Sequence, residues 1–218
     1  MMRELLSNKI KVLNSDLIEM ASLVEKQIYD SIIAFKNQDA DLASTVIKND
    51  DKVDELQKDI EEKCIKFMAT ESPLAGDLRK IYTTSKIVTD LERMADHAVD
   101  LSKIVERIKE ENLVNEISPV WEMGDLVIKM IKASIEAYID GDIQSAYEIC
   151  NMDDKVDEIY QGMFKIILKK MSKDESIINQ GTQILFASKY IERIGDHVTN
   201  VCEWIIFSEK GNYVDLNE

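Results

Sequence analysis

The chain of 218 residues has little glycine or proline, with only 7 Gly and 2 Pro. This scarcity argues against a loop-rich sheet protein, and no alternation of apolar and polar residues persists long enough to indicate a strand. Hydrophobic residues make up 45% of the chain, which is enough for a packed core. The composition therefore predicts an all-α globular protein.

Basic residues are also scarce, with 27 Lys and Arg against 42 Asp and Glu and a net charge of −15. Nucleic-acid backbones are bound by clustered Lys and Arg, so this charge balance predicts no DNA or RNA partner. For the same reason we expect any attachment to a membrane to be made through proteins rather than through anionic lipid.

Cysteines are few, and Cys64, Cys150 and Cys202 lie far apart in the sequence without a CxxC pattern. They are interpreted as reduced core residues of a cytosolic protein, not as a disulfide or zinc framework. The N-terminal segment lacks an apolar signal region, and no stretch approaches about 18 uninterrupted apolar residues. We therefore expect neither secretion nor membrane spanning.

What the chain does contain is an internal duplication. The block DDKVDE at 50–55 returns unchanged at 153–158, and ERMADH at 92–97 matches ERIGDH at 192–197. Both blocks lie in segments where apolar residues recur at spacings of three and four, as in amphipathic helices. The sequence therefore indicates one acidic helical unit that occurs twice in the chain.

Each half is predicted to contain three long helices. Apolar periodicity places the second and third helices of the first half at 40–70 and 72–109, and their copies at 142–172 and 177–208. Ser72 and Pro73 have the residue types of an N-cap and a first helical position, and Ser118 and Pro119 repeat that start signal. The first helix of each half carries related apolar stripes, at 17–35 and 123–138.

A mixed polar segment at 110–117 separates the halves. Helices this amphipathic bury their apolar stripes by packing together, so each half is expected to form an antiparallel three-helix bundle. The predicted architecture is two tandem bundles, at 1–112 and 113–218.

Acidic residues four positions apart lie on one face of a helix, about one turn apart. Such pairs occur on two helices of each half, and the third helix of the first half extends its stripe by one more carboxylate. The candidate metal ligands are Asp50, Asp54, Glu92, Asp96 and Asp100 in the first half, and Asp153, Asp157, Glu192 and Asp196 in the second. Oxygen-only ligation favours hard cations such as Mg²⁺, Ca²⁺, Mn²⁺ or iron, with zinc also open.

The acidic residues of the third helix of the first half lie progressively farther from its apolar face. With Leu91 at zero, Glu92, Asp96 and Asp100 lie at roughly 100°, 140° and 180° around the helix. A cation held there would sit at the bundle surface against a neighbouring helix. The alternative is a solvated acidic face with no ligand, since like charges on one helix cost little at an exposed position.

His97 and His197 directly follow an Asp and point about 100° away from it, so they are interpreted as surface residues or as outer hydrogen-bond partners of the ligands. Arg93 and Arg193 are interpreted as flanking charge partners. No nucleophilic triad or nucleotide-binding loop can be assembled, and the Glu-x-x-His spacing of di-iron proteins is absent from these motifs.

The chain as a whole resembles the PhoU family. The resemblance rests on SPLAGDLR at 72–79, LERMADH at 91–97 and ERIGDHVTNVCE at 192–203, and it covers nearly the whole chain. It implies a cytosolic negative regulator of phosphate uptake and of the phosphate-starvation response, peripheral to the inner face of the membrane. Its implied partners are the ATPase subunit of the phosphate transporter and a sensor histidine kinase; a homodimer stays open.

Some members of that family carry multinuclear metal clusters on paired acidic motifs. Carried over, the clusters would use Asp50, Asp54, Glu92 and Asp96 in one half, and Asp153, Asp157, Glu192 and Asp196 in the other, with Fe, Mn, Mg or Zn. The first half has Asp100 where the second has Asn200, which predicts unequal sites. The alternatives are a metal-free helical scaffold or chaperone-like protein, and a carboxylate-bridged metalloenzyme.

Overall fold

The computed structural model of the chain describes residues 2–108 and 117–216, with side chains from Leu6 onward. Within these residues it has six long α-helices and one short 3-10 helix, and no strand. In chain order they are α1 (Met2–Asn37), α2 (Ala40–Thr70), α3 (Ala75–Val105), α5 (Ser118–Asp140), α6 (Ile143–Met171), η1 (Glu175–Ile177) and α7 (Ile178–Lys210). The all-α prediction is confirmed.

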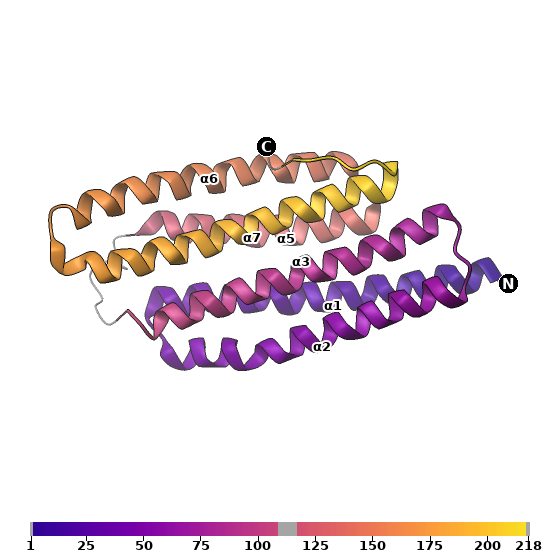
Figure 1. Cartoon of the computed structure of the whole chain (residues 1–218), viewed down its shortest axis with the longest axis horizontal. Coiled ribbons are helices and arrows are strands. Elements are labelled where there is room, and N and C mark those ends of the chain that lie inside the picture. Colours follow the sequence, from indigo (N-terminus) through magenta and orange to yellow (C-terminus); the bar gives the residue numbers. More distant parts are fainter. Residues whose placement is uncertain (1, 109–116, 217–218) are drawn as a thin grey trace.

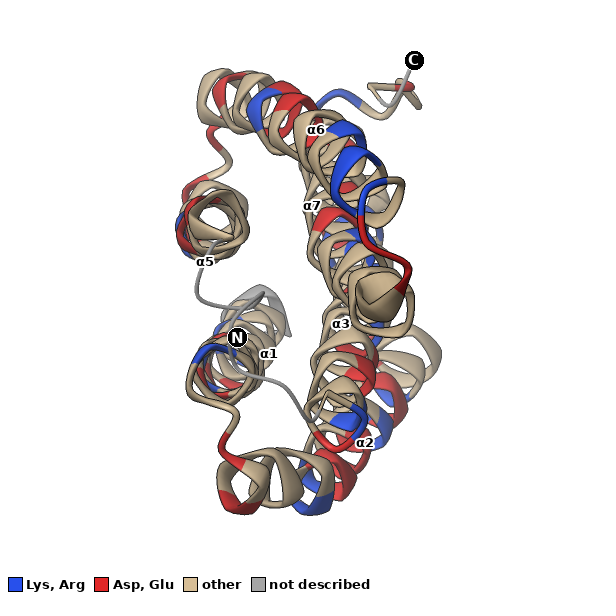
Figure 2. Cartoon of the chain, turned by 90° about the vertical axis from the view of Figure 1, so that its left-hand side faces the viewer, with Lys and Arg blue, Asp and Glu red and all other residues tan. Residues whose placement is uncertain are grey.

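The helices form two three-helix bundles that lie side by side (Figure 1). Helices α1, α2 and α3 make the first bundle, and α5, α6 and α7 make the second. Seen end-on, α3 and α7 lie together in the middle, α2 and α6 form the two outer edges, and α1 and α5 are neighbours on one side (Figure 2). The two bundles thus share one extended contact along α3 and α7.

Helix ends follow the local sequence. Asp39 caps α2 by accepting a hydrogen bond from the backbone N–H of Leu42 at 2.9 Å, and Asp142 caps α6 by accepting from Gln144 and Ser145. Helix α5 ends at Asp140 and is capped by Gly141, whose φ of 67° is left-handed and suits glycine.

The predicted start of the third helix is wrong by a few residues. Ser72 adopts a left-handed backbone conformation with a φ of 47°, so it turns the chain and does not cap a helix. Helix α3 begins instead at Ala75, after Leu74 in extended conformation, and ends at Val105 rather than near 109. The Ser118–Pro119 signal does mark the start of α5, but Ser118 is its first helical residue and not the cap.

The apolar core is continuous across both halves. Fully buried side chains such as Leu17, Ile60 and Leu91 in the first half belong to the same cluster as Met123 and Ile194 in the second. The predicted boundary at 112/113 lies outside the described residues. None of the described helices is long and apolar enough to cross a membrane.

Candidate metal centres

The candidate ligands gather at two corresponding seams, one in each bundle. Asp50 and Asp54 on α2 face Glu92 and Asp96 on α3, and these four side chains are called the first quartet. The second quartet consists of Asp153 and Asp157 on α6 with Glu192 and Asp196 on α7. In each quartet the four-residue spacing puts both carboxylates of a helix on the face that meets the other helix.

The first quartet is half-buried. Burial raises the pKa of Asp50 and of Glu92 above their usual values, and the neighbouring carboxylates raise them further. Two groups offset part of this charge. Gln27 of α1 donates a hydrogen bond from Nε2 to Asp50 Oδ1 at 2.8 Å, and the Arg93 guanidinium lies 3.5 Å from Glu92 and 3.3 Å from Asp96.

The second quartet is buried more deeply. Asp153 is 9% exposed and Glu192 is 8% exposed. Burial, with the charges of the other three carboxylates, raises the pKa of Asp153 to about 7, although Thr199 Oγ1 donates to its Oδ2 at 3.1 Å. Burial also raises the pKa of Asp157 and of Glu192, while Lys189 Nζ lies 2.5 Å from Glu192.

The residues of the second quartet fit a hard cation in three respects. Oδ1 of Asp153 and Oδ1 of Asp157 are buried, and neither has a hydrogen-bond partner among the described residues. Buried oxygens of this kind are costly unless something satisfies them. Gly195 lets the Asp153 carboxylate pack directly against α7, because a Cβ there would overlap Asp153 Oδ1. The donors are all carboxylate oxygens, which suit Mg²⁺, Mn²⁺ or iron.

The side chains as they lie are spread apart. Among the described residues, no three His, Cys, Asp or Glu side chains converge closely enough to hold a metal ion. Like charges repel, and Arg93 and Lys189 draw Glu92 and Glu192 toward themselves. Ligation would therefore require the carboxylates to turn inward and Glu192 to release Lys189.

The two quartets are not equivalent, and sequence reasoning missed the residues that make them differ. In the second half Thr199, Gly195 and Lys189 touch the carboxylates, whereas the first half has Val99, Ala95 and Thr89 at the corresponding positions. Conversely, Gln27 of the first half corresponds to Met130, which is fully buried. Aligning the repeats position by position around the acidic residues would have exposed these differences.

Asp100 forms its ion pair outside the first quartet. Its carboxylate pairs with Lys103 at 3.1 Å, and the charges that raise the pKa of Asp50 and of Glu92 come from within the first quartet and from Asp51. The corresponding Asn200 donates a hydrogen bond to Asp90 Oδ1 of the other bundle at 3.1 Å. A ligand role for Asp100 stays a prediction.

The two histidines lie half-buried where α3 meets α7. His197 Nδ1 is 3.0 Å from Asp90 Oδ1, and the ring of His97 stacks on Tyr190 with 5.8 Å between centroids. Burial, together with the neighbouring His197, lowers the pKa of His97 to about 4. These side chains join the two helices that carry Glu92 and Glu192, a contact between halves that helical periodicity cannot predict.

All three cysteines are free thiols. Cys64 and Cys202 are buried as predicted, and burial raises the pKa of Cys64 to about 12. Cys150 is half-buried, one turn before Asp153, and is hydrogen-bonded to Cys202 across the seam between α6 and α7. Their separation in the sequence gave no sign of this contact.

Comparison with known proteins agrees with the duplication. The family model of the PhoU domain matches the chain twice, at 17–105 and 120–205. A phosphate-specific transport system accessory protein PhoU homolog of Clostridium acetobutylicum is 47% identical over the full length of both chains. The phosphate-specific transport system accessory protein PhoU of Escherichia coli K12 is 32% identical over 93% of this chain and 84% of its own.

Solved structures show the same architecture. The crystal structure of the phosphate transport system regulatory protein PhoU from Streptococcus pneumoniae superposes with a TM-score of 0.91 at 28% identity, covering 96% of this chain and 99% of that one. PhoU from Pseudomonas aeruginosa gives a TM-score of 0.87 at 30% identity, covering 94% and 99%. The predicted pair of three-helix bundles is confirmed.

Proposed function

This chain belongs to the PhoU family, and we propose that it is a metal-binding adaptor that restrains phosphate uptake and the phosphate-starvation response. Its partners would be the ATPase subunit of a phosphate transporter and a sensor histidine kinase, met at the cytoplasmic face of the membrane. The names of its relatives as accessory proteins of phosphate-specific transport support a role in that system. No enzymatic step is part of the proposal.

The observation that carries the metal proposal is the pair of buried oxygens in the second quartet. Asp153 Oδ1 and Asp157 Oδ1 lack partners among the described residues, and the first of them lies directly against Gly195 of α7. A bound cation would supply positive charge to both helices at once, which would offset the repulsion among the carboxylates and hold α6 against α7. Asp153, Asp157, Glu192 and Asp196 would hold it there, with the first quartet as the corresponding site in the other half.

The adaptor proposal rests on shape and charge. Helices of 23 to 36 residues give long, rigid faces of the kind used for protein contact. The net charge of −15 opposes direct binding to anionic lipid, so attachment through protein partners is the simpler route to a membrane.

The test is a deletion strain grown in phosphate-rich medium. Loss of the gene should switch on phosphate-starvation genes, and a pull-down with the tagged protein should recover the transporter ATPase or the kinase. Complementation with Asp153→Asn and Glu192→Gln together then tests the metal, and Asp154→Asn, an exposed acid next to Asp153, is the matched control. Silent starvation genes after deletion, with neither partner recovered, would exclude the adaptor role.

A further inference from the structure

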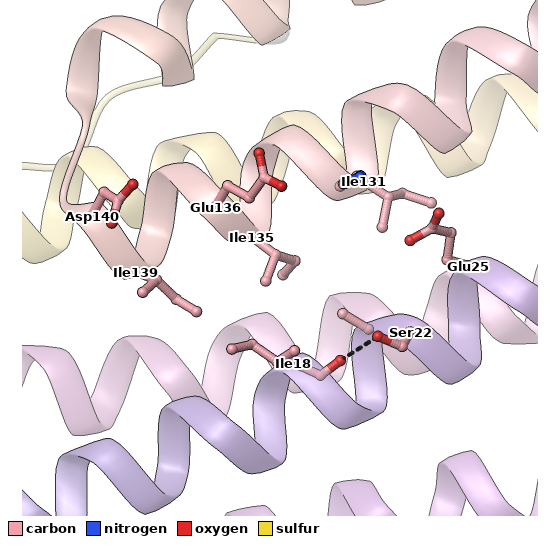
Figure 3. A pocket seen from close by; sticks show the side chains of 10 residues that line it. Ile18, Ser22, Glu25, Ile131, Ile135, Glu136, Ile139 and Asp140 are labelled. Carbon is pink, nitrogen blue, oxygen red and sulfur yellow. Dashed lines mark hydrogen bonds between the residues drawn. The ribbon is translucent and has the colours of Figure 1, made fainter.

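A groove of about 380 Å³ runs between α1 and α5, where the two bundles meet on the face opposite α3 and α7 (Figures 2 and 3). It lies apart from both quartets. Its walls come from the first helix of each half: Ile18, Ala21, Ser22, Glu25, Ile131, Lys132, Ile135, Glu136, Ile139 and Asp140.

The floor of the groove is apolar. Ala21, Ile131 and Ile135 are almost fully buried there, while Ile18 and Ile139 are 46% and 36% exposed. Figure 3 shows Ile135 and Ile139 of α5 directed toward the α1 side of the groove, where Ile18 lies. Two large aliphatic side chains open to solvent beside an apolar floor form a surface that gains stability when another apolar group covers it.

The rim of the groove is acidic. Glu25 on α1 and Glu136 and Asp140 on α5 face one lysine, Lys132, and none of these four makes an ion pair within the described residues. The carboxylates of Glu136 and Asp140 also border a second hollow of about 300 Å³ between α5 and α6, which adds Asp142 to the same surface. The charges available at the rim are therefore mostly negative and free to meet a partner.

The geometry suits a helix. Helices α1 and α5 run antiparallel, since the ring of Phe35 contacts that of Trp121 at one end and Ile18 and Ile139 line the same groove toward the other. A groove between two antiparallel helices accepts a third helix lying along it, as in a three-helix bundle. The span from Ile131 to Asp140 is about 14 Å, which corresponds to between two and three helical turns.

We propose that this groove binds a basic amphipathic helix of a partner protein, with apolar residues at i, i+3 or i+4, and i+7 on the floor and Lys or Arg at the rim. A second copy of this chain would bring the same carboxylates against each other. An anionic membrane or a nucleic acid would meet the same repulsion. The proposal does not depend on metal at the quartets or on the identity of the regulated transporter.

The probe is a synthetic 18-residue helix of Leu and Lys with one apolar stripe, labelled for fluorescence anisotropy. Two control peptides keep its length: one replaces Lys with Glu, and one scrambles the order so that no stripe forms. Only the striped basic peptide should bind the full-length protein. The double variant Ile18→Ser with Ile139→Ser should weaken binding about tenfold or more, because it removes the exposed apolar contacts.

Ile65→Ser with Ile166→Ser is the matched control, since both isoleucines are exposed but lie on α2 and α6. It should leave binding unchanged. Replacing Glu25, Glu136 and Asp140 by their amides should weaken binding several-fold and flatten its dependence on salt.

Equal loss in both isoleucine double variants would overturn the proposal, as would equal binding of the scrambled peptide. Sedimentation is the second measurement. A dimer that dissociates in the Ile18→Ser and Ile139→Ser variant, with no peptide bound, would assign the groove to a second copy instead.

Discussion

Replacing Gly195 by Ala tests whether the second quartet is packed as tightly as its contacts indicate. Gly195 lies inside α7, where Ala normally stabilises a helix by about 1 kcal/mol relative to Gly. Here the added methyl group would overlap Asp153 Oδ1, so the buried carboxylate has to turn. Turning it breaks the 3.1 Å hydrogen bond from Thr199.

The cost can be estimated from these contacts. Loss of a hydrogen bond at a buried acceptor costs about 1–3 kcal/mol. A carboxylate forced off its rotamer adds about 0.5–1.5 kcal/mol. After the gain in helix propensity, we expect Gly195→Ala to lower the free energy of unfolding by about 1–3 kcal/mol.

Gly162→Ala is the matched control, because Gly162 lies inside α6 and nothing is within 4 Å of a Cβ placed there. That change should stabilise the protein by about 0.5–1 kcal/mol. Urea unfolding in the presence of chelator measures both. The cost of Gly195→Ala should also disappear in an Asp153→Ala background, since the overlapping oxygen is gone. Stabilisation by Gly195→Ala, or the same cost in both backgrounds, would refute the packing argument.

Three further predictions concern the carboxylates. The pKa of Asp153 is about 7 in the folded protein and about 3.9 in the unfolded chain, so between these pH values the folded protein holds a proton that the unfolded chain releases. In the presence of chelator, the free energy of unfolding should therefore fall as pH rises from about 4 to 7, by at most about 1.4 kcal/mol per pH unit from this group. Asp153→Asn should flatten this pH dependence in urea unfolding, and an unchanged slope would contradict the assignment. Gln27→Met, which copies the second half, should remove the donor to Asp50 and destabilise the protein by about 1–3 kcal/mol in the same assay, and no loss would mean that solvent replaces that hydrogen bond. The number of charged ligands tunes affinity for hard cations, so in calorimetric titrations Asp100→Asn should weaken Mn²⁺ binding by the first quartet and Asn200→Asp should strengthen it by the second. Affinities that neither substitution changes would exclude Asp100 as a ligand.

Apolar periodicity was enough to predict the helices, and the repeated acidic blocks were enough to predict which carboxylates share a face of one helix. Spacing of four residues fixes which side of a helix Asp50 and Asp54 share, and duplication then places Asp153 and Asp157 in the same way. These are local properties of a helix, so the sequence contains them in full.

Contacts across helices were harder to predict. The hydrogen bond from Thr199 to Asp153 and the close approach of Asp153 to Gly195 depend on how α7 is rotated against α6. The stacking of His97 on Tyr190 depends on how the two bundles dock, which periodicity within one helix does not specify. Ser72 does not cap α3, because the turn between α2 and α3 holds its backbone in the left-handed conformation.

The most direct test of the metal-binding adaptor is the metal content of protein purified without chelator, measured together with its melting temperature. We predict bound metal and a rise in melting temperature with Mn²⁺, since binding to the folded state alone contributes about 2.7 kcal/mol at a ligand concentration of 100 times Kd. Asp153→Asn with Asp157→Asn should abolish the part of that rise due to the second quartet, while Asp154→Asn should preserve it. Protein without metal, whose melting temperature neither Mn²⁺ nor chelator changes, would contradict the account and leave the quartets as metal-free acidic faces.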